Sequence, residues 1–415
     1  MPTIMIIGAN FANKGAQSML FTTVGIIKKR FPKSKIIFAH GDECDISNFN
    51  FEEVYYSPES VMIALHEHKN RVIISRYIKN FIKKILGRKV IKMDCKQLNK
   101  IISKVDFIVD ISGFSLGSKW GDASVYRYTN NIKLAKKYNI PIILMPQSFG
   151  DFEWKNNRKK LDNILREYMQ YPIHIFAREK DGEILLRQYG LKNVTVHPDM
   201  ILCSVEPDIS LIYKEVPIIQ VPEVTSEHNV GILPNMRSFE HGNKIEILDM
   251  YRKIIRRLLE RGKTVYLFRH SFEDLIACRW IKEMFHDEER VVLWENDFSC
   301  FEYDAVCRKF EFLIVGRFHG IVHAYRNNVP CVILGWAIKY KELSKIMGQE
   351  LYVFDVTNRN IEADKIVHAL DDMDENLLKN KDIIRERLAQ VQSKSTCFNV
   401  MLKGIEDVAN KKMAY

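Results

Sequence analysis

The sequence has no long apolar run and no paired cysteines. Nowhere do about 18 consecutive apolar residues occur, so no transmembrane helix is expected. The apolar segment at residues 4–7 is too short for a signal peptide, and no cleavage site follows it. The eight cysteines are scattered, with no C-x-x-C pair and no histidine spacing typical of zinc, which predicts reduced thiols and no metal site. These absences predict a cytoplasmic protein and leave open a peripheral contact with the inner face of the cytoplasmic membrane.

The familiar glycine-rich phosphate motifs are missing as well. Residues 8–16 follow the first expected strand and open a helix, but they contain neither G-x-G-x-x-G nor a Gly-Lys-Ser ending. Ala39 and His40 stand where an acidic residue should end the second strand of a dinucleotide-binding fold. The sequence therefore supports neither a dinucleotide fingerprint nor a P-loop. The turn at Asn10 is either an ordinary strand-to-helix turn or an anion site at a helix N-terminus.

What the sequence does contain is typical of a globular protein with an anionic partner. Hydrophobic residues make up 47% of the chain and no tract rich in Pro, Gly and Ser interrupts it, so the whole chain should fold. Lys and Arg number 62 against 52 Asp and Glu, which gives a net charge of +10. This charge suits phosphorylated metabolites or anionic lipid head groups. Nucleic acid is not expected, because no zinc-finger spacing, Arg/Gly-rich tail or RNP-like strand occurs.

Short apolar runs that end in Gly, Asn, Ser or Pro alternate with segments of helical period, and this pattern occurs twice. It predicts an α/β protein with two Rossmann-like lobes and a cleft between them. We expect the first lobe over residues 1–205, a proline-containing linker over 206–227 and the second lobe over 228–362. A helical tail over 363–415 is expected to cross back and brace the first lobe. Ligands of such folds bind outside the carboxyl ends of the strands.

A basic segment, residues 71–92, interleaves Lys and Arg with Ile, Val, Leu and Phe. It is either an amphipathic helix that lies on an anionic membrane or a solvated helix that covers the first lobe. A membrane contact would suit a lipid-linked substrate. The sequence leaves both interpretations open.

Polar residues follow two of the expected strands in the first lobe. The strand over 107–111 leads into Ser112 and Gly113, and the next strand leads into Gln147 and Ser148. Glycine at such a turn allows backbone conformations that side chains forbid, while the hydroxyl and amide groups can bind a polar ligand. Two polar strand ends in one lobe favour an acceptor cleft there.

Cations follow apolar strands in both lobes, namely Arg178 in the first and Arg237 and His270 in the second. The clearest instance is the turn that holds Arg317 and His319, between an apolar strand and a helix. A guanidinium matches a carboxylate or phosphate through two hydrogen bonds, and histidine titrates near neutral pH as a general acid or base. These residues favour a site that binds an anion and transfers protons.

Several short segments, taken in their order and spacing, resemble the polysaccharide pyruvyltransferase family across nearly the whole chain. They are Gly8-Ala9-Asn10, Asp110-Ile111-Ser112-Gly113, Pro146-Gln147-Ser148-Phe149-Gly150, Arg178-Glu179, Pro198-Asp199 and Gly316-Arg317-Phe318-His319. The resemblance implies a fold like that of the two-lobed GT-B glycosyltransferases. It also implies transfer of a pyruvyl group from phosphoenolpyruvate onto two sugar hydroxyls as a cyclic ketal.

The resemblance also implies roles for individual residues. The family's Arg-x-His motif falls on Arg317, Phe318 and His319, and its Arg-Glu pair falls on Arg178 and Glu179. One departure is Ser112-Gly113, where family members commonly have two glycines, and it concerns the acceptor more than the donor. The expected site residues are therefore His319, Arg317 and His270 for catalysis, Arg317, Phe318, Arg178 and Arg237 for the donor, and Asn10, Ser112, Gly113, Gln147 and Asp199 for the acceptor.

The implied reaction needs phosphoenolpyruvate as co-substrate and no metal or further cofactor. Its acceptor would be a sugar of a surface polysaccharide, such as an exopolysaccharide or capsule, or a lipid-linked oligosaccharide precursor. Two alternatives stay open. One is a GT-B glycosyltransferase that uses a nucleotide sugar, since a fold does not settle a function. The other is a scaffold of a polysaccharide assembly complex that has kept the fold without the chemistry.

Overall fold

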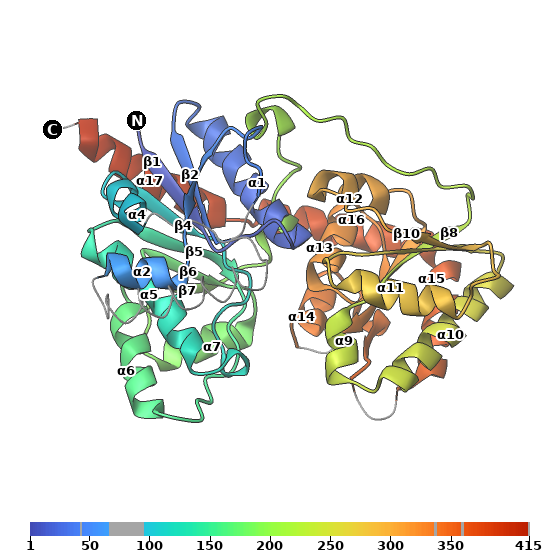
Figure 1. Ribbon diagram of the computed structural model, residues 1–415. Coiled ribbons are helices and arrows are strands. Elements are labelled where there is room, and N and C mark those ends of the chain that lie inside the picture. Colours follow the sequence, from blue (N-terminus) through green and yellow to red (C-terminus); the bar gives the residue numbers. More distant parts are fainter. Residues whose placement is uncertain (42–43, 66–94, 336–337, 358–360, 414–415) are drawn as a thin grey trace, which may run out of the picture.

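The computed structural model describes residues 1–41, 44–65, 95–335, 338–357 and 361–413. These residues form two parallel sheets side by side, each flanked by helices (Figure 1). The first sheet has the order β3-β2-β1-β4-β5-β6-β7, with strands β1 (Thr3–Ile7), β2 (Lys35–His40), β3 (Glu52–Tyr55), β4 (Phe107–Asp110), β5 (Ile142–Gln147), β6 (His174–Ala177) and β7 (Val194–Val196). The second has the order β10-β9-β8-β11-β12-β13, with strands β8 (Asn229–Leu233), β9 (Thr264–Phe268), β10 (Val291–Trp294), β11 (Phe312–Val315), β12 (Cys331–Gly335) and β13 (Val353–Asp355).

The central strands are apolar runs because helices cover both faces of each sheet. All residues of β4 are buried, as are all those of β8, β9, β11 and β12. In both sheets the strand order reverses direction beside the first strand of the lobe, which puts β1 next to β4 and β8 next to β11. Such a switch point opens a crevice at the carboxyl ends of the strands, and there a ligand can enter.

Helices connect the strands in both lobes. In the first lobe they are α1 (Lys14–Arg30), α2 (Pro58–Ala64), α4 (Cys95–Ile102), α5 (Ala123–Lys137), α6 (Arg158–Tyr168), α7 (Lys180–Gln188) and α8 (Met200–Cys203). In the second they are α9 (Met236–His241), α10 (Lys244–Glu260), α11 (Asp274–Glu283), α12 (Cys300–Cys307), α13 (Phe318–Arg326) and α14 (Ile338–Ile346). None of the described helices is long and apolar enough to cross a membrane.

The C-terminal helices join the two lobes. Helix α15 (Ala363–Glu375) packs on α10 of the second lobe, and α16 (Leu377–Ser393) contacts α8 and α13. Helix α17 (Cys397–Met413) lies against α1, β4 and β5 of the first lobe, at the far left of Figure 1. The chain therefore ends on the lobe in which it began.

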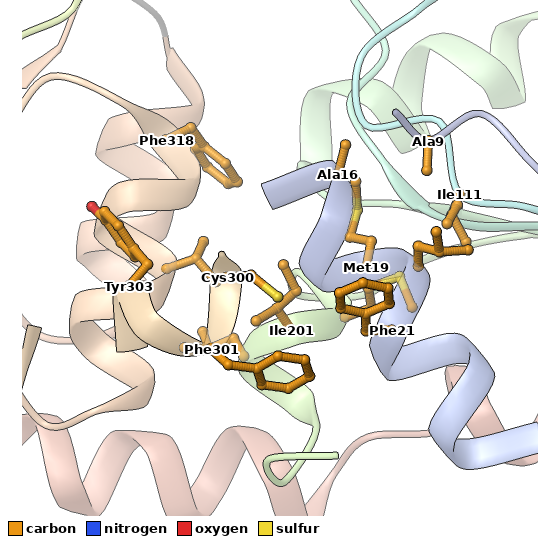
Figure 2. Close-up of a cluster of buried hydrophobic side chains, with 14 of the residues drawn as sticks. Ala9, Ala16, Met19, Phe21, Ile111, Ile201, Cys300, Phe301, Tyr303 and Phe318 are labelled. Atoms are coloured by element: carbon orange, nitrogen blue, oxygen red, sulfur yellow. The ribbon is translucent and has the colours of Figure 1, made fainter. Parts of the chain in front are cut away.

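The lobes share one hydrophobic cluster on the side of α1 and α12. The ring of Phe21 in α1 stacks on that of Phe301 in α12, with centroids 5.5 Å apart and an interplanar angle of 4° (Figure 2). Polar contacts flank this stack. The backbone N–H of Cys300 donates to the side-chain oxygen of Gln17 over 2.8 Å, and Lys14 pairs with Asp297 at 2.8 Å. Aromatic packing and these contacts hold the lobes together along one edge of the cleft.

The structure differs from the expected pattern at the edges of the sheets. Strands β3 and β13 were not expected, and both lie at the edge of a sheet with short sequences that include acidic residues, EEVY and VFD. The basic segment at 71–92 lies outside the described residues.

Candidate active site

A cavity of about 910 Å³ lies between the lobes at the carboxyl ends of the strands. The predicted site residues that line it are Asn10, Gly113, Arg178, Arg237, His270, Arg317, Phe318 and His319. Ser112, Gln147 and Asp199 do not line it, because they are buried behind the wall and bonded to other residues. The Ser112 N–H donates to the Asp110 carboxylate over 2.8 Å, and the Tyr128 hydroxyl donates to Gln147 over 2.6 Å. The cavity thus gathers the predicted donor residues and only part of the predicted acceptor set.

Arg178 emerges from the end of β6 and is held by the first lobe. Its Nη1 donates to Asp199 Oδ2 over 2.7 Å, and its Nε and Nη2 donate to Ser148 Oγ over 3.2 and 2.9 Å. Nη2 also donates to the carbonyl oxygen of Gly113. Asp199 reaches across the cleft as well, because its Oδ2 lies 3.4 Å from Nε2 of His319. One carboxylate therefore links the predicted Arg of the first lobe to the predicted His of the second.

The protonation states of this group follow from its burial. Burial raises the pKa of Asp199, but His319 and Arg178 outweigh that effect and hold the pKa well below the ordinary aspartate value. Burial lowers the pKa of His319, and the neighbouring Asp199 only partly opposes the change. Near neutral pH, Asp199 is therefore an anion and His319 is neutral. A neutral imidazole beside a carboxylate can accept a proton and is stabilised once it is charged.

His319 lies in the first turn of α13, pressed against the first turn of α1. A Cβ on Gly15 would lie 2.1 Å from Cγ of His319, so only glycine fits at that position. The preceding turn is fixed by Asn235, whose Nδ2 donates to the carbonyl oxygen of Gly316 over 2.7 Å. The position of the imidazole is thus set by backbone from both lobes.

Arg317 is bound by two carboxylates. Its Nε and Nη2 donate to Asp274 over 2.9 and 2.6 Å, and Nη2 donates to Glu273 over 2.7 Å. Asp274 is fully buried and also accepts the backbone N–H groups of Met236 and Ser271. These two carboxylates compensate the guanidinium charge. Arg317 therefore lines the cavity as a side chain whose position is fixed and whose charge is already largely neutralised.

Lys339 is a cavity residue that the sequence reasoning did not single out. It belongs to α14, and its Nζ lies 5.2 to 5.8 Å from the ring centroids of Phe318, Phe114 and Tyr340. It forms no ion pair with any carboxylate of the described residues. Burial, helped by the nearby Arg178, lowers its pKa to about 7. The sequence did contain a signal for it. Lys339 comes shortly after the apolar strand β12, and ligands of this fold bind at the carboxyl ends of the strands.

His270 follows β9, is 1% exposed and lines the cavity. Neither ring nitrogen has a hydrogen-bond partner among the described residues. The ring stands edge-on to Tyr303, with centroids 5.1 Å apart. Burial, together with the nearby His323 and His319, lowers its pKa well below the ordinary value. It is a neutral imidazole whose nitrogens are available to a ligand or to water.

The remaining predicted residues lie at the cavity wall in lesser roles. Arg237 pairs with Glu240 at 2.6 Å on the exposed side, and the side-chain oxygen of Asn10 accepts the N–H of Asn13 over 3.0 Å. Among the described residues, one group could hold a metal ion, formed by His40, Cys44 and Glu53. It does not belong to the cavity wall.

Solved structures of other proteins are similar in fold to nearly the whole chain. UGT2 of Phytolacca americana, solved with UDP-2fluoro-glucose and pterostilbene, is similar to the chain with a TM-score of 0.54, 12% identity and 99% of each chain covered. The UDP-GlcNAc 2-epimerase of Neisseria meningitidis is similar with a TM-score of 0.51 and 11% identity, and the match covers 98% of this chain and 100% of the epimerase. The UDP-GlcNAc 2-epimerase of Methanocaldococcus jannaschii is similar with a TM-score of 0.50 and 12% identity, and the match covers 89% of this chain and 92% of the epimerase. No curated protein matches the sequence.

These likenesses define the fold class, two Rossmann-like lobes of the GT-B kind with a cleft between them, as predicted. The family follows from the sequence. The model of the polysaccharide pyruvyl transferase family matches residues 13–337, and the chain belongs to that family. It is thus a transferase by family, and the predicted resemblance is confirmed.

Proposed function

We propose that the chain transfers a pyruvyl group from phosphoenolpyruvate onto two hydroxyls of a sugar, which closes a cyclic ketal. The chain belongs to the polysaccharide pyruvyl transferase family, and the observation that carries the proposal is how charged and titratable side chains are arranged in its cavity. Lys339 faces the cavity without a described carboxylate partner, beside a neutral His319 that contacts the anionic Asp199 at 3.4 Å. A substrate with a phosphate and a carboxylate suits such a cation, and hydroxyl attack suits such a base.

Each residue has a task in this proposal. Lys339 binds an anionic group of phosphoenolpyruvate, and Arg317, held in place by Asp274, offers its remaining donor. His319 takes the proton of an attacking hydroxyl, and Asp199 stabilises the imidazolium that results. Ketal formation also needs a proton at the former enol carbon, which the His319 imidazolium can return, while the neutral His270 in the same cavity can pass the proton of the second hydroxyl to the departing phosphate. The oxocarbenium-like centre that develops at the reacting carbon is positive, so the nearby anionic Asp199 would stabilise it.

The acceptor in this proposal is a sugar of a surface polysaccharide or of its lipid-linked precursor. The family supports a polysaccharide acceptor. A cytoplasmic location and a peripheral membrane contact stay predictions, and so does the absence of a metal or cofactor from the reaction.

The test is a coupled measurement on the purified chain. It is incubated with phosphoenolpyruvate and a panel of sugar acceptors, and phosphate release is followed together with the mass of the acceptor. We expect phosphate release that requires both substrates and adds a pyruvyl ketal to the sugar. His319→Asn should abolish it, while His286→Asn, at an exposed histidine after α11, should leave it unchanged.

A parallel incubation replaces phosphoenolpyruvate by nucleotide sugars. Release of a nucleoside diphosphate without any use of phosphoenolpyruvate would overturn the proposal in favour of a glycosyltransferase. No turnover of either donor with any acceptor would favour the scaffold.

A further inference from the structure

The first-lobe wall of the cavity carries an aromatic pair that no assigned role uses. Phe114 and Trp120 both line the cavity, with ring centroids 5.5 Å apart and an interplanar angle of 71°. Trp120 lies in a short 3-10 helix, Ser118–Trp120, and is 45% exposed. About half of the Trp120 surface is therefore open at the wall of a polar cavity, where a ligand could cover it.

The pair is held rigidly by two loops that follow neighbouring strands. In the loop after β5, the backbone N–H of Ser148 donates to the carbonyl oxygen of Gly113 over 2.9 Å, and the N–H of Gly150 donates to the carbonyl oxygen of Leu116 over 3.1 Å. In the opposite direction, the backbone N–H of Ser118 donates to the carbonyl oxygen of Asp151 over 2.7 Å. These bonds fix the loop on both sides of Phe114 and lead directly into Trp120.

The ring of Phe114 is seated on a glycine. A Cβ on Gly150 would lie 3.0 Å from the far end of that ring, so the absence of a side chain there leaves room for the edge of the ring. Its position therefore does not depend on a ligand. A wall that keeps its shape when empty binds with a smaller loss of conformational entropy.

The pair lies next to the proposed reacting groups. A Cβ on Gly113, the residue before Phe114, would lie 3.7 Å from Cε1 of His319. From the second lobe, Nζ of Lys339 lies 5.3 Å from the centroid of Phe114. A ligand stacked on the aromatic pair would thus reach the imidazole and the ammonium with its polar edge.

We propose that Phe114 and Trp120 form an aromatic platform for the pyranose ring of the acceptor, an inference that rests on the proposed function. A pyranose has one face of polarised C–H groups and a rim of hydroxyls. Its C–H face suits the electron-rich face of an aromatic ring, as the positive edge of another ring does. The rim of hydroxyls is then left free to point at His319 and Lys339, where the ketal closes.

The experiment measures sugar binding directly on the full chain, without turnover. The probes are the methyl pyranosides of glucose, galactose, mannose and N-acetylmannosamine, observed by saturation-transfer NMR. We expect transfer to the C–H protons of one face in at least one of them. Trp120→Ala should weaken its binding about tenfold or more, and Trp120→Phe should recover most of the loss, since an aromatic face remains.

The matched control is Ile184→Ala, at a residue of the same lobe with 47% exposure that lies outside the cavity wall. It should leave binding and melting temperature unchanged. Unchanged sugar binding in Trp120→Ala, or no binding of any of these pyranosides to the natural chain, overturns the platform. Binding of uridine that depends on Trp120 in place of the sugars would also overturn it, in favour of a nucleobase site.

The aromatic platform and the proposed reaction can be tested independently, because the sugar and phosphoenolpyruvate contact different residues. Calorimetric binding of phosphoenolpyruvate should be the same in Trp120→Ala and in the natural chain, because Lys339 and Arg317 are untouched. If pyranoside binding depends on Trp120 while phosphoenolpyruvate neither binds nor reacts, the proposed reaction is wrong and the platform stands.

Discussion

At the scale of single residues, the value of a cation as an anion ligand depends on what already surrounds it. Arg317 is compensated by Asp274 and Glu273, and Arg178 donates to Asp199. Lys339 has aromatic rings around it in place of carboxylates. Because its charge is not already neutralised, Lys339 contributes more to the binding of an incoming anion than either arginine.

The depressed pKa of Lys339 predicts a pH dependence of donor binding. The ammonium is protonated below its pKa of about 7 and loses its charge above it, so the affinity for phosphoenolpyruvate should fall as the pH rises through that value. The fall approaches about tenfold per pH unit, the limit for the loss of one proton. Lys339→Arg should flatten the curve, because a guanidinium stays charged. Titration calorimetry between about pH 6 and about pH 9 measures this, and identical curves for the two proteins would contradict it.

The contact of Gly15 with His319 predicts a loss of activity without a loss of fold. In Gly15→Ala the new methyl group needs the space of the imidazole, which lies 2.1 Å away, so the ring must move. A displacement of about 1 Å at a catalytic group costs on the order of 100-fold in rate. Alanine is a better helix former than glycine, so α1 itself is not weakened.

The measurement is kcat with saturating substrates, together with the melting temperature. Gly182→Ala in α7 is the control, because its Cβ would meet Phe149 at an ordinary 3.5 Å. Full activity in Gly15→Ala would show that the imidazole position does not matter.

Sequence reasoning located part of this site for physical reasons. Arg178, Arg317 and His319 each follow a buried strand, and parallel strands bring such positions to one edge. Three other features depend on packing between distant segments. Asp274 lies 43 positions from Arg317, the rings around Lys339 come from both lobes, and Trp120 sits in a short 3-10 helix.

At the scale of elements, β4 ends in a buried carboxyl group. Asp110 is 1% exposed, and burial raises its pKa to about 6, although the Ser112 N–H partly opposes the rise. In the unfolded chain the group ionises near 3.8, its ordinary value. The folded state therefore binds more protons between these values, and stability falls as the pH rises from about 4 to about 6. Above that range the folded protein carries a penalty of up to about 3 kcal/mol.

This penalty predicts that Asp110→Asn stabilises the protein at neutral pH. The amide oxygen can still accept the Ser112 N–H, and no charge has to be buried. The gain in the free energy of unfolding, measured by urea denaturation, should be largest near about pH 7 and should vanish below about pH 4.

Asp106→Asn, just before the same strand, serves as the comparison. It removes an ion pair with Lys412 at 2.7 Å, so no gain is expected there. A gain of Asp110→Asn that is the same at every pH would contradict the assignment.

Elements differed in how well the sequence predicted them. Buried central strands such as β8 and β11 are continuous apolar runs and were expected. The edge strands β3 and β13 are only four and three residues long and include acidic residues, so their sequences resemble loops. They become strands because a neighbouring strand offers a row of backbone partners, which is information from the sheet and not from the segment.

At the scale of the whole molecule, the two lobes are one folding unit. The hydrophobic cluster that contains Phe21 of the first lobe also contains Phe301 of the second. The linker adds to it, because Ile212 is fully buried in the same cluster. Helix α17 then ties the end of the chain to β4 and β5. A shared core of this kind predicts a single cooperative unfolding transition for the natural chain.

Phe301→Ala should uncouple the lobes. Loss of a buried Phe ring costs about 3–5 kcal/mol, and here the loss falls on the contact between the lobes. We expect the melting temperature to fall by roughly 4–6 °C and the calorimetric enthalpy to exceed the van't Hoff enthalpy, the sign of two transitions. Phe312→Ala, in a core confined to the second lobe, should lower the melting temperature while the lobes stay coupled through Phe21 and Phe301. Two transitions in the natural chain would mean that the lobes unfold independently. One unchanged transition in Phe301→Ala would mean that other contacts couple the lobes, of which the pair of Lys14 with Asp297 is the first to remove.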